Sequence, residues 1–474
     1  MLETTPMLKQ YAEIKEKHQS ELLLFRLGDF YELFGEDAKE ASRLLDIVLT
    51  ARHRGTPHET PMCGIPYHAL ENYLAKLLKA GKRVAICEQL SDPNLSGLVK
   101  RDVIQVITPG TTLVDSTLKN KSNNFIACLV LEKNIWGLAL ADLTTGDFRL
   151  AEISDLGLLK SELFRFAISE VIVQREILYD TRFSEFFSEL PNVSGRELPT
   201  FEKPCSILLK HFKINNLQSF GVENLEIGIK AGGLLLNYLK ETQKTELDHI
   251  TMLRRYNFAD YMVLDEATIR NLELFQTLFS ASYEGSLLSV IDKTQTNMGG
   301  RLLRQWLILP LTNVESIKAR LAAVRELKID SALLRGLSEK FKLMPDMERL
   351  IGRLGCRRAT ARDLAGLRVC LQMIPLFKNL LIGKEAALLK KIQTELNEEK
   401  ELVSLLEKAI VDEPPAVIIE GGMIREGYNA ELDEWRKISR GGKDWIAQFQ
   451  AQEVERTGIG SLKVRFNQVF GYYI

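Results

Sequence analysis

The sequence predicts a multidomain protein in which two α/β domains are followed by an α-helical region. The chain has 474 residues, which at about 100–200 residues per domain is enough for three or four domains. Short apolar runs alternate with amphipathic segments as far as about residue 242, which is typical of α/β folds. From about residue 247 long segments carry apolar residues three and four positions apart, a spacing that predicts helices.

The first α/β region is predicted to form a strand, a helix, a loop, a second helix and two more strands. An apolar run that ends at Gly28 predicts the buried first strand, and Gly81 ends the second helix. The expected elements are a strand at Leu22–Leu27, a helix from Asp29 to about Thr50, a loop at Arg52–Pro57, a helix at Ala69–Ala80, and strands at Val84–Cys87 and Val103–Ile107.

The second α/β region begins after a polar link, Asn120–Asn124. Asp142 and Asp147 flank a turn there; such residues are more often turn formers than Mg²⁺ ligands. Three strands are expected, joined by turns at Lys133-Asn134 and Thr145-Gly146: Phe125–Leu131, Trp136–Leu140 and Phe148–Leu150.

The third region is predicted to be helical up to a break at Pro414-Pro415, which a small hairpin at Val417–Gly422 follows. A strand that alternates polar and apolar residues is expected at Leu462–Asn467. Because an apolar strand with no turn after it ends at Ile474, the natural chain is expected to continue. The expected helices are Leu264–Leu278, Gly299–Leu307, Val314–Ile329, Leu364–Leu381, Leu388–Val411 and Ala430–Arg456.

Composition excludes several classes of protein and favours none. Hydrophobic residues make up 45% of the chain and charged residues 26%, as in ordinary globular proteins, and no apolar run is long enough to span a membrane. Lys and Arg (62) balance Asp and Glu (63), so charge does not point to nucleic acid. Six dispersed cysteines without an export signal predict buried, reduced thiols in a cytosolic protein, and the scattered histidines predict no metal site.

The common catalytic fingerprints are missing. No phosphate-binding loop occurs, because Gly441-Gly442-Lys443 is followed by Asp444 rather than by Ser or Thr. No dinucleotide fingerprint, nucleophile elbow or zinc-protease motif occurs either.

The most informative segment is Gly28-Asp29-Phe30-Tyr31-Glu32. Taken alone, it is explained by local structure: Asp29 suits a helix N-cap, and Glu32 three residues later completes a capping box. Helical periodicity places Phe30 and Tyr31 on either side of the apolar stripe, so it does not decide which ring is buried.

A series of short motifs runs in order along essentially the whole chain, beginning with Gly28–Phe34. The others are Asp37–Lys39, Pro61-Met62, Gly64–Ala69, Glu71–Leu74, Val84–Gln89, Thr108–Thr111, Gly221–Asn224, Leu264–Thr268, Arg270–Glu273, Pro310-Leu311, Tyr428-Asn429, Glu431–Asp433, Phe466-Asn467 and Gly471–Ile474. This series resembles the MutS family of DNA mismatch-recognition proteins, and its length and order make the resemblance highly specific.

The resemblance implies a mismatch-recognition domain over residues 1–115, a connector with a ribonuclease-H-like fold over 120–245, a helical core with levers over 246–425, and the first part of a clamp over 426–474. It also implies that the rest of the core, the second clamp arm and an ATPase domain follow Ile474. The full-length family is a weak DNA-dependent ATPase, so ATP and Mg are expected for the whole protein. No enzyme activity and no cofactor are expected in this chain.

By resemblance, Phe30 is a wedge that enters DNA from the minor groove, stacks on a mispaired or unpaired base and kinks the duplex. A mismatch has already lost stacking, so it kinks more cheaply than a matched pair. Glu32 is implied to hydrogen-bond the displaced base. Burial and nearby phosphates are expected to raise the pKa of Glu32, which would let the protonated carboxyl donate a hydrogen bond to a purine N7.

Other residues near this motif are expected to border the groove. They are Leu27, Asp29, Arg52 and Tyr67. Arg52 is expected to contact a phosphate or sugar, and its alternative role is a solvated loop cation.

The polar face of the last strand is the expected clamp contact to backbone phosphates. It consists of Lys463, Arg465 and Asn467, and its alternative is an ordinary solvent-facing strand. A basic run on the clamp helix is expected to be solvated rather than bound: Arg436, Lys437, Arg440 and Lys443.

The implied partners are duplex DNA with mismatches or small loops, a second copy when full length, and a MutL-type repair protein. The expected location is cytoplasmic and DNA-associated, with no membrane. Two alternatives are a superfamily relative that acts as a DNA-structure-binding helical scaffold in recombination, and a nuclease based on the second domain. The Phe30–Glu32 pair argues against the scaffold, and the missing acidic constellation argues against the nuclease.

Overall fold

The structure, a computed structural model, describes residues 5–56, 58–91, 99–198, 203–467 and 471–474. The chain divides into two compact units. The first contains Met1–Ala359 and Gln372–Asn397, and the second contains Thr360–Leu371 and Glu398–Ile474. The backbone therefore passes between the units more than once.

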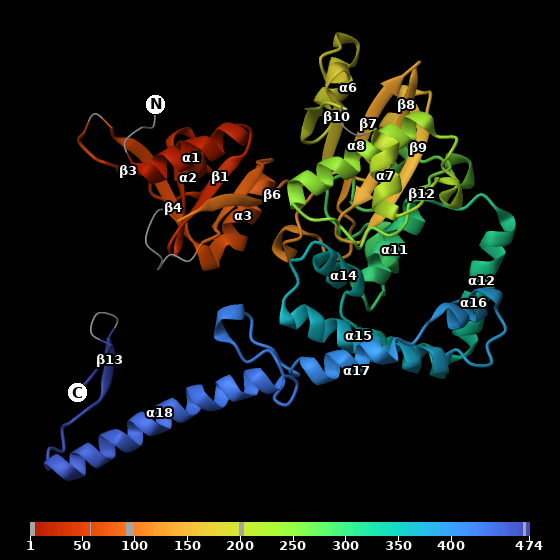
Figure 1. Ribbon diagram of the computed structural model, residues 1–474. Coiled ribbons are helices and arrows are strands. Elements are labelled where there is room, and N and C mark those ends of the chain that lie inside the picture. Colours follow the sequence, from red (N-terminus) through yellow and green to blue (C-terminus); the bar gives the residue numbers. More distant parts are fainter. Residues whose placement is uncertain (1–4, 57, 92–98, 199–202, 468–470) are drawn as a thin grey trace. The chain divides into compact units, whose positions relative to one another are not determined.

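The N-terminal part of the first unit is a six-stranded mixed sheet with helices packed against it (Figure 1). The strand order is β3-β4-β2-β1-β5-β6, in which β1 and β5 are parallel and all other neighbours are antiparallel. The elements are α1 (Pro6–Lys17), β1 (Leu22–Leu27), β2 (Phe30–Phe34), α2 (Gly35–Leu45), β3 (Thr50–Arg52), β4 (Thr60–Pro66), α3 (Leu70–Lys79), β5 (Val84–Gln89) and β6 (Arg101–Ile107).

Strand β1 sends its side chains into two apolar cores. Leu22 and Leu24 belong to the core that residues of α2 and α3 share, while Leu23 and Phe25 belong to the core beneath α1. Successive strand residues point to opposite faces, so a strand covered on both sides needs a continuous apolar run. The predicted strand at Leu22–Leu27 is confirmed.

The predicted helix from Asp29 is wrong over its first turns. The structure places strand β2 there, and α2 begins only at Gly35. Asp29 is therefore not an N-cap, and Glu32 does not complete a capping box; Phe34 occupies the N-cap position and makes no side-chain capping bond. The Gly-Asp pair before β2 instead forms a two-residue hairpin loop, a common connection between antiparallel strands.

The next part of the first unit is a second six-stranded sheet in the order β11-β10-β7-β8-β9-β12. β7, β8 and β9 are antiparallel neighbours, whereas β10, β11 and β12 each run parallel to the neighbour they join. The three strands predicted here are confirmed. The elements are β7 (Phe125–Glu132), β8 (Ile135–Asp142), β9 (Asp147–Ile153), α4 (Leu156–Arg165), β10 (Glu170–Gln174), α5 (Arg175–Leu178), α6 (Ser184–Ser188), β11 (Val193–Arg196), α7 (Pro204–Phe212), α8 (Glu226–Gln243) and β12 (Arg254–Arg255).

Helix α8 packs its backbone directly on this sheet. A Cβ atom added at Gly137 of β8 would lie 2.2 Å from the carbonyl oxygen of Ile227. Only glycine permits that approach. The predicted turn at Lys133-Asn134 has positive φ at both residues (49° and 61°), as a two-residue type I′ hairpin requires.

The remainder of the first unit is helical. Its helices are α9 (Glu266–Asn271), α10 (Leu287–Ile291), α11 (Asn297–Ile308), α12 (Val314–Ile329), α13 (Ser331–Lys342), α14 (Met347–Gly355), the second half of α15 (Ala361–Leu380) and α16 (Ala387–Glu395). The prediction for Val314–Ile329 is confirmed. The predicted helix at Leu264–Leu278 is wrong after α9, because the chain turns at Glu273, whose φ is 48°.

The single helix predicted over Leu388–Val411 is two helices, α16 and α17 (Lys400–Ala409). The halves pack in different units: Leu389 joins a cluster with Ala323 in the first, and Ala409 joins one with Ala365 in the second. No glycine or proline lies between Leu388 and Val411 to mark the break, which is why the sequence predicts one helix.

The second unit contains the first half of α15, α17, the long α18 (Ala430–Thr457) and a hairpin of β13 (Arg465–Asn467) with β14 (Gly471–Tyr473). α18 runs through Gly441-Gly442 as one helix. The small hairpin predicted at Val417–Gly422 is wrong, because Ile418–Glu420 forms a 3₁₀ turn. The last predicted strand is also shorter, since β13 begins only at Arg465.

Five of the six cysteines are buried, but Cys205 is exposed, so the prediction of buried thiols is wrong at that position. Over the ranges that the structure describes, no group of three or more His, Cys, Asp or Glu side chains is arranged to hold a metal ion. Within the same ranges, no helix has the length and apolar character needed to cross a bilayer.

Candidate nucleic-acid interface

Phe30 stands at the tip of the β1–β2 hairpin. Gly28 and Asp29 form the two-residue loop, with Gly28 at φ 59°, and Leu27 pairs with Phe30 as the last pair of the ladder. Phe30 is 47% exposed, whereas Tyr31 is only 4% exposed and packs in the core with α2 and α3. Strand alternation thus decides which of the two rings faces outward.

Phe30 and Glu32 lie on the sheet face that α1 covers, beyond the part that the helix reaches. Phe34 follows them on that face, and the Tyr11 ring of α1 lies 5.0 Å from the Phe34 ring, centroid to centroid. Across the sheet, Glu32 pairs with Gly64 of β4. Because glycine has no side chain, nothing from that position covers the Glu32 carboxylate.

Glu32 is half-buried and has little compensation for its charge. Its Oε2 atom is shielded from solvent and makes no hydrogen bond with the described residues. The nearest cation is Arg52, whose Nη1 lies 3.9 Å from Oε2. Burial raises the pKa of Glu32, and the charge of Arg52 opposes part of that rise. The direction agrees with the one expected from the sequence.

Arg52 ends strand β3 and is not a free loop cation. It pairs with Thr60 across the β3–β4 ladder, and its ion pair with Glu32 brings together two of the residues predicted for the site. The loop was predicted to start at Arg52, but Arg52 still belongs to β3. The turn begins one residue later, at His53, whose φ is 55°.

Leu27, Asp29 and Tyr67 lie around the same tip. Leu27 packs against the core beneath α1, and Asp29 is exposed while its carbonyl oxygen accepts a hydrogen bond from the Tyr67 N–H at 3.0 Å. The Tyr67 ring faces the guanidinium of Arg26, 3.9 Å from ring centroid to Cζ. Sequence reasoning missed Arg26; its only signal is a charged residue inside an apolar strand run.

The residues predicted to form the clamp contact belong to the second unit. Lys463 and Arg465 are exposed. Asn467 is part of β13, but its side chain lies outside the described residues, as do those of Arg440 and Lys443.

The basic run on α18 is only partly solvated, which corrects the expectation for Arg436. The Arg436 guanidinium pairs with Asp433 at 3.1 Å and donates to the Ile424 carbonyl at 2.8 Å. Lys437 is exposed, as expected.

The two aspartates of the second sheet have structural partners. Asp142 accepts hydrogen bonds from the Thr144 N–H at 2.9 Å and from Asn123 Nδ2 at 2.7 Å. Asp147 forms an ion pair with Arg149. The Asp142 contact with the Thr144 N–H fits the turn-forming role, while the Asp147 carboxylate is paired with Arg149 within strand β9.

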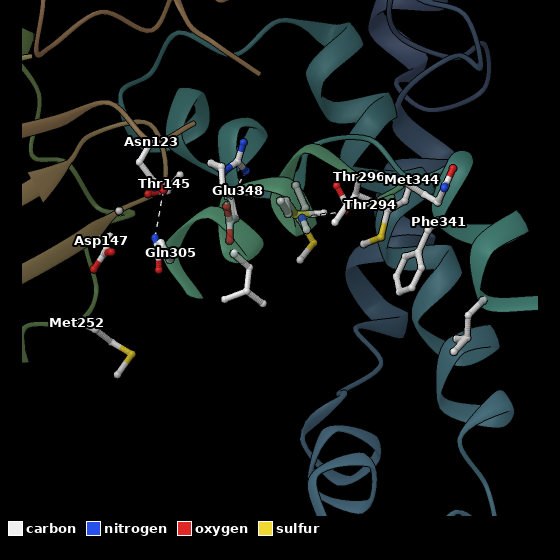
Figure 2. A pocket seen from close by; sticks show the side chains of 18 of the residues that line it. Asn123, Thr145, Asp147, Met252, Thr294, Thr296, Gln305, Phe341, Met344 and Glu348 are labelled. Atoms are coloured by element: carbon white, nitrogen blue, oxygen red, sulfur yellow. Dashed lines mark hydrogen bonds and ion pairs between the residues drawn. The ribbon is translucent and has the colours of Figure 1, made fainter. Parts of the chain in front are cut away.

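A cavity of about 790 Å³ opens between the second sheet and the helices of the first unit (Figure 2). Two pairs of its polar side chains are hydrogen-bonded: Gln305 donates to Asn123 Oδ1 at 3.1 Å, and Glu348 accepts from Arg301 at 2.6 Å. Apolar side chains such as Met252 and Phe341 complete the lining, and none of the predicted site residues belongs to it. The labelled lining residues are Asn123, Thr145, Asp147, Met252, Thr294, Thr296, Gln305, Phe341, Met344 and Glu348.

Family models of three consecutive domains match the chain. MutS domain I matches residues 5–116, MutS domain II residues 124–251 and MutS domain III residues 267–466.

Curated relatives match over the whole chain. The DNA mismatch repair protein MutS of Halothermothrix orenii is 44% identical over 478 residues, which are 100% of this chain and 53% of that protein. The protein of the same name from Ruminiclostridium cellulolyticum is 44% identical over 99% of this chain and 54% of its own length, and that from Salinibacter ruber is 43% identical over 99% and 52%. The chain spans about half the length of the curated relatives it matches. With three domain matches in sequence order and similarity along its entire length, this chain belongs to the MutS family.

Proposed function

We propose that this chain recognises mispaired or unpaired bases in duplex DNA and acts in mismatch repair, with Phe30 as a wedge inserted from the minor groove. The observation that carries the proposal is the large aromatic ring that stands exposed at a hairpin tip beside a carboxylate. A protein that buried this ring in its own core would have no group to insert.

The wedge discriminates through the deformability of the DNA. Inserting an apolar ring between base steps unstacks them and kinks the duplex, at a cost of about a few kcal/mol per step. A mispaired step has already lost part of its stacking, so it yields at lower cost than a matched one. The same ring therefore serves many different mispairs without reading a base code.

Glu32 is proposed to hydrogen-bond the displaced base. It lies two residues after Phe30 on the same sheet face, and its Oε2 has no hydrogen bond within the described residues. Burial already raises the pKa of Glu32 in the free protein, which favours a protonated carboxyl that donates to a purine N7. Arg52, 3.9 Å away, would then exchange its ion pair for a phosphate or sugar.

The remaining contacts and the wider architecture are proposals of the same kind. Leu27 and Asp29 would border the groove, and Lys463, Arg465 and Asn467 would contact backbone phosphates from the clamp. The domains would divide at about residues 115, 245 and 425. The strand order β9-β8-β7-β10-β11 supports a ribonuclease-H-like connector.

The whole protein is proposed to be a DNA-associated, cytoplasmic homodimer that works with a MutL-type partner. Its sliding-clamp cycle would use ATP and Mg bound by a domain outside this chain.

Competition gel shifts with a G·T duplex and its matched control test the proposal. The chain is expected to prefer the G·T duplex, and Phe30→Ala is expected to remove that preference while leaving weak, salt-sensitive binding. Tyr179→Ala is the control, because Tyr179 is an exposed aromatic residue of the second sheet region. A Phe30→Ala variant that keeps its preference would refute the wedge.

A further inference from the structure

Arg26 lies beneath the hairpin tip, on the face opposite Phe30. It pairs with Tyr31 across the β1–β2 ladder, so the two side chains share the face that points away from Phe30 and Glu32. Its guanidinium makes three kinds of contact at once. Nε donates to the Gly28 carbonyl, Nη1 lies 3.4 Å from a Glu88 carboxylate oxygen, and Cζ lies 3.9 Å from the centroid of the Tyr67 ring.

Two backbone groups of the tip form hydrogen bonds with residues at the ends of nearby strands: Gln89 of β5, and Tyr67, which follows β4. The Gly28 N–H donates to Gln89 Oε1 at 3.2 Å, and the Asp29 carbonyl accepts from the Tyr67 N–H at 3.0 Å. These bonds hold the Leu27–Gly28 and Asp29–Phe30 peptide groups, and Arg26 holds the Gly28–Asp29 peptide group between them. Arg26 links these anchors, because it touches the Gly28 carbonyl and the Tyr67 ring together.

We propose that Arg26 is a positioning residue for mismatch recognition: it fixes the Gly28-Asp29 turn and thereby the direction of the Phe30 ring, without contacting DNA. The inference rests on the proposed wedge function of Phe30. A wedge that is ordered before binding loses less conformational entropy when it inserts, so its stacking energy is used more fully.

The contact set requires arginine. A planar guanidinium stacks on a ring while its N–H groups reach a carbonyl and a carboxylate in the same plane, whereas a lysine ammonium offers one compact charge. Arg26→Lys therefore keeps the positive charge but removes the planar group that makes these contacts together. The matched control is Arg43→Lys on α2, since Arg43 also donates from Nε to a backbone carbonyl, that of Lys39, but lies away from the tip.

Amide hydrogen exchange tests the proposal without DNA. Arg26→Lys is expected to speed exchange at Gly28, Phe30 and Tyr67, while Arg43→Lys leaves those amides unchanged. Unchanged exchange at all three amides in Arg26→Lys would overturn the positioning role, whatever the chain binds.

A double-mutant cycle tests the link to recognition. Arg26→Lys is expected to lower the ratio of mismatched to matched affinity by about tenfold and to have no further effect in the Phe30→Ala background, because it acts through that ring. Tyr67→Leu, which removes the stacking ring, is expected to repeat the result. Additive effects of Arg26→Lys and Phe30→Ala would overturn the proposal.

The salt dependence of binding to matched DNA separates positioning from direct contact. Arg26→Gln is expected to leave the slope of log affinity against log salt unchanged, whereas loss of a phosphate contact would lower it by about one. A lowered slope would overturn the inference. If Phe30→Ala keeps its preference, the proposed function fails; if Phe30→Ala loses it and Arg26→Lys does not, only the present inference fails.

Discussion

At the scale of single residues, the Glu32 carboxylate links stability to pH. Burial raises the pKa of Glu32, so the folded chain holds that proton more tightly than the unfolded chain does. Its contribution to stability is complete below the unfolded pKa and is lost as the pH rises through the folded pKa. Ionised Glu32 therefore destabilises the fold at neutral pH.

Replacing Glu32 with a side chain that cannot ionise tests this linkage. The unfolding free energy of Glu32→Gln, relative to the parent chain, is expected to increase from about pH 4 to about pH 7. Urea unfolding at the two pH values measures it. Glu36→Gln, at an exposed carboxylate of α2, is the control. If the unfolding free energy of Glu32→Gln relative to the parent chain did not change with pH, burial would not be the cause of the raised pKa.

The same carboxylate is expected to weaken binding to matched DNA. Glu32→Ala removes a negative charge close to the proposed path of the phosphates, which should strengthen matched binding several-fold, an effect of about 1 kcal/mol. It should also narrow the preference for mismatches, because the displaced base loses its partner. Titration of both duplexes measures the two effects, and unchanged affinity for matched DNA would contradict repulsion by Glu32.

The sequence identified the important segment but not the orientation of its rings. The motif from Gly28 to Glu32 and its resemblance pointed to Phe30, whereas helical periodicity left Phe30 and Tyr31 equivalent. Only the strand geometry separates them, because alternation sends Tyr31 into the core. Arg26 escaped prediction because its role depends on Tyr67 and Glu88, which other strands and loops bring to it.

At the scale of elements, the β1–β2 turn depends on glycine. Gly28 has φ 59°, a conformation that costs an L-amino acid about 1–2 kcal/mol. Gly28→Ala is expected to lower the unfolding free energy by about 1 kcal/mol, as measured by urea unfolding. Gly64→Ala on β4 is the control for stability, because a Cβ there meets neighbours no closer than 3.4 Å and its φ is not positive. Equal losses in both variants would show that the turn conformation is not the cause.

The sequence predicted an element correctly where both of its faces are buried. Predictions were wrong where a strand runs directly into a helix and where one predicted helix packs in two units. The run at Leu22–Leu27 is covered on both faces, so its apolar character predicts a strand directly. Phe30–Phe34 precedes a true helix without a break in the apolar spacing, so the helical period was extended too far. The interruption between α16 and α17 follows from packing in separate units, which no local signal reports.

At the scale of the whole molecule, a buried arginine ties the helical region to the link between the two sheets. Arg301 of α11 is 2% exposed; it donates to both carboxylate oxygens of Asp346 at 2.6 and 2.7 Å and to the Asn120 carbonyl at 3.1 Å. Glu348 of α14 accepts a further bond at 2.6 Å. The network joins segments more than 180 residues apart in sequence.

Removing this arginine should destabilise the first unit far more than removing a surface one. Arg301→Ala removes a buried guanidinium and leaves Asp346, whose side chain is 14% exposed, with only its contacts to Arg349 among the described residues, so it is expected to cost about 3–5 kcal/mol. Arg182→Ala, at an ion pair whose arginine is 72% exposed, is expected to cost less than about 1 kcal/mol. Chemical unfolding of both variants measures the difference, and similar small losses would mean that the network does not stabilise the unit.

The place of β2 within its sheet has a mechanical consequence. β2 is an interior strand, hydrogen-bonded to β1 on one side and to β4 on the other. Any load on the Phe30 ring is therefore shared by two neighbouring strands rather than borne by one free edge. In the proposed encounter with a duplex, both neighbouring strands would support the ring, so the DNA is expected to deform before the hairpin does.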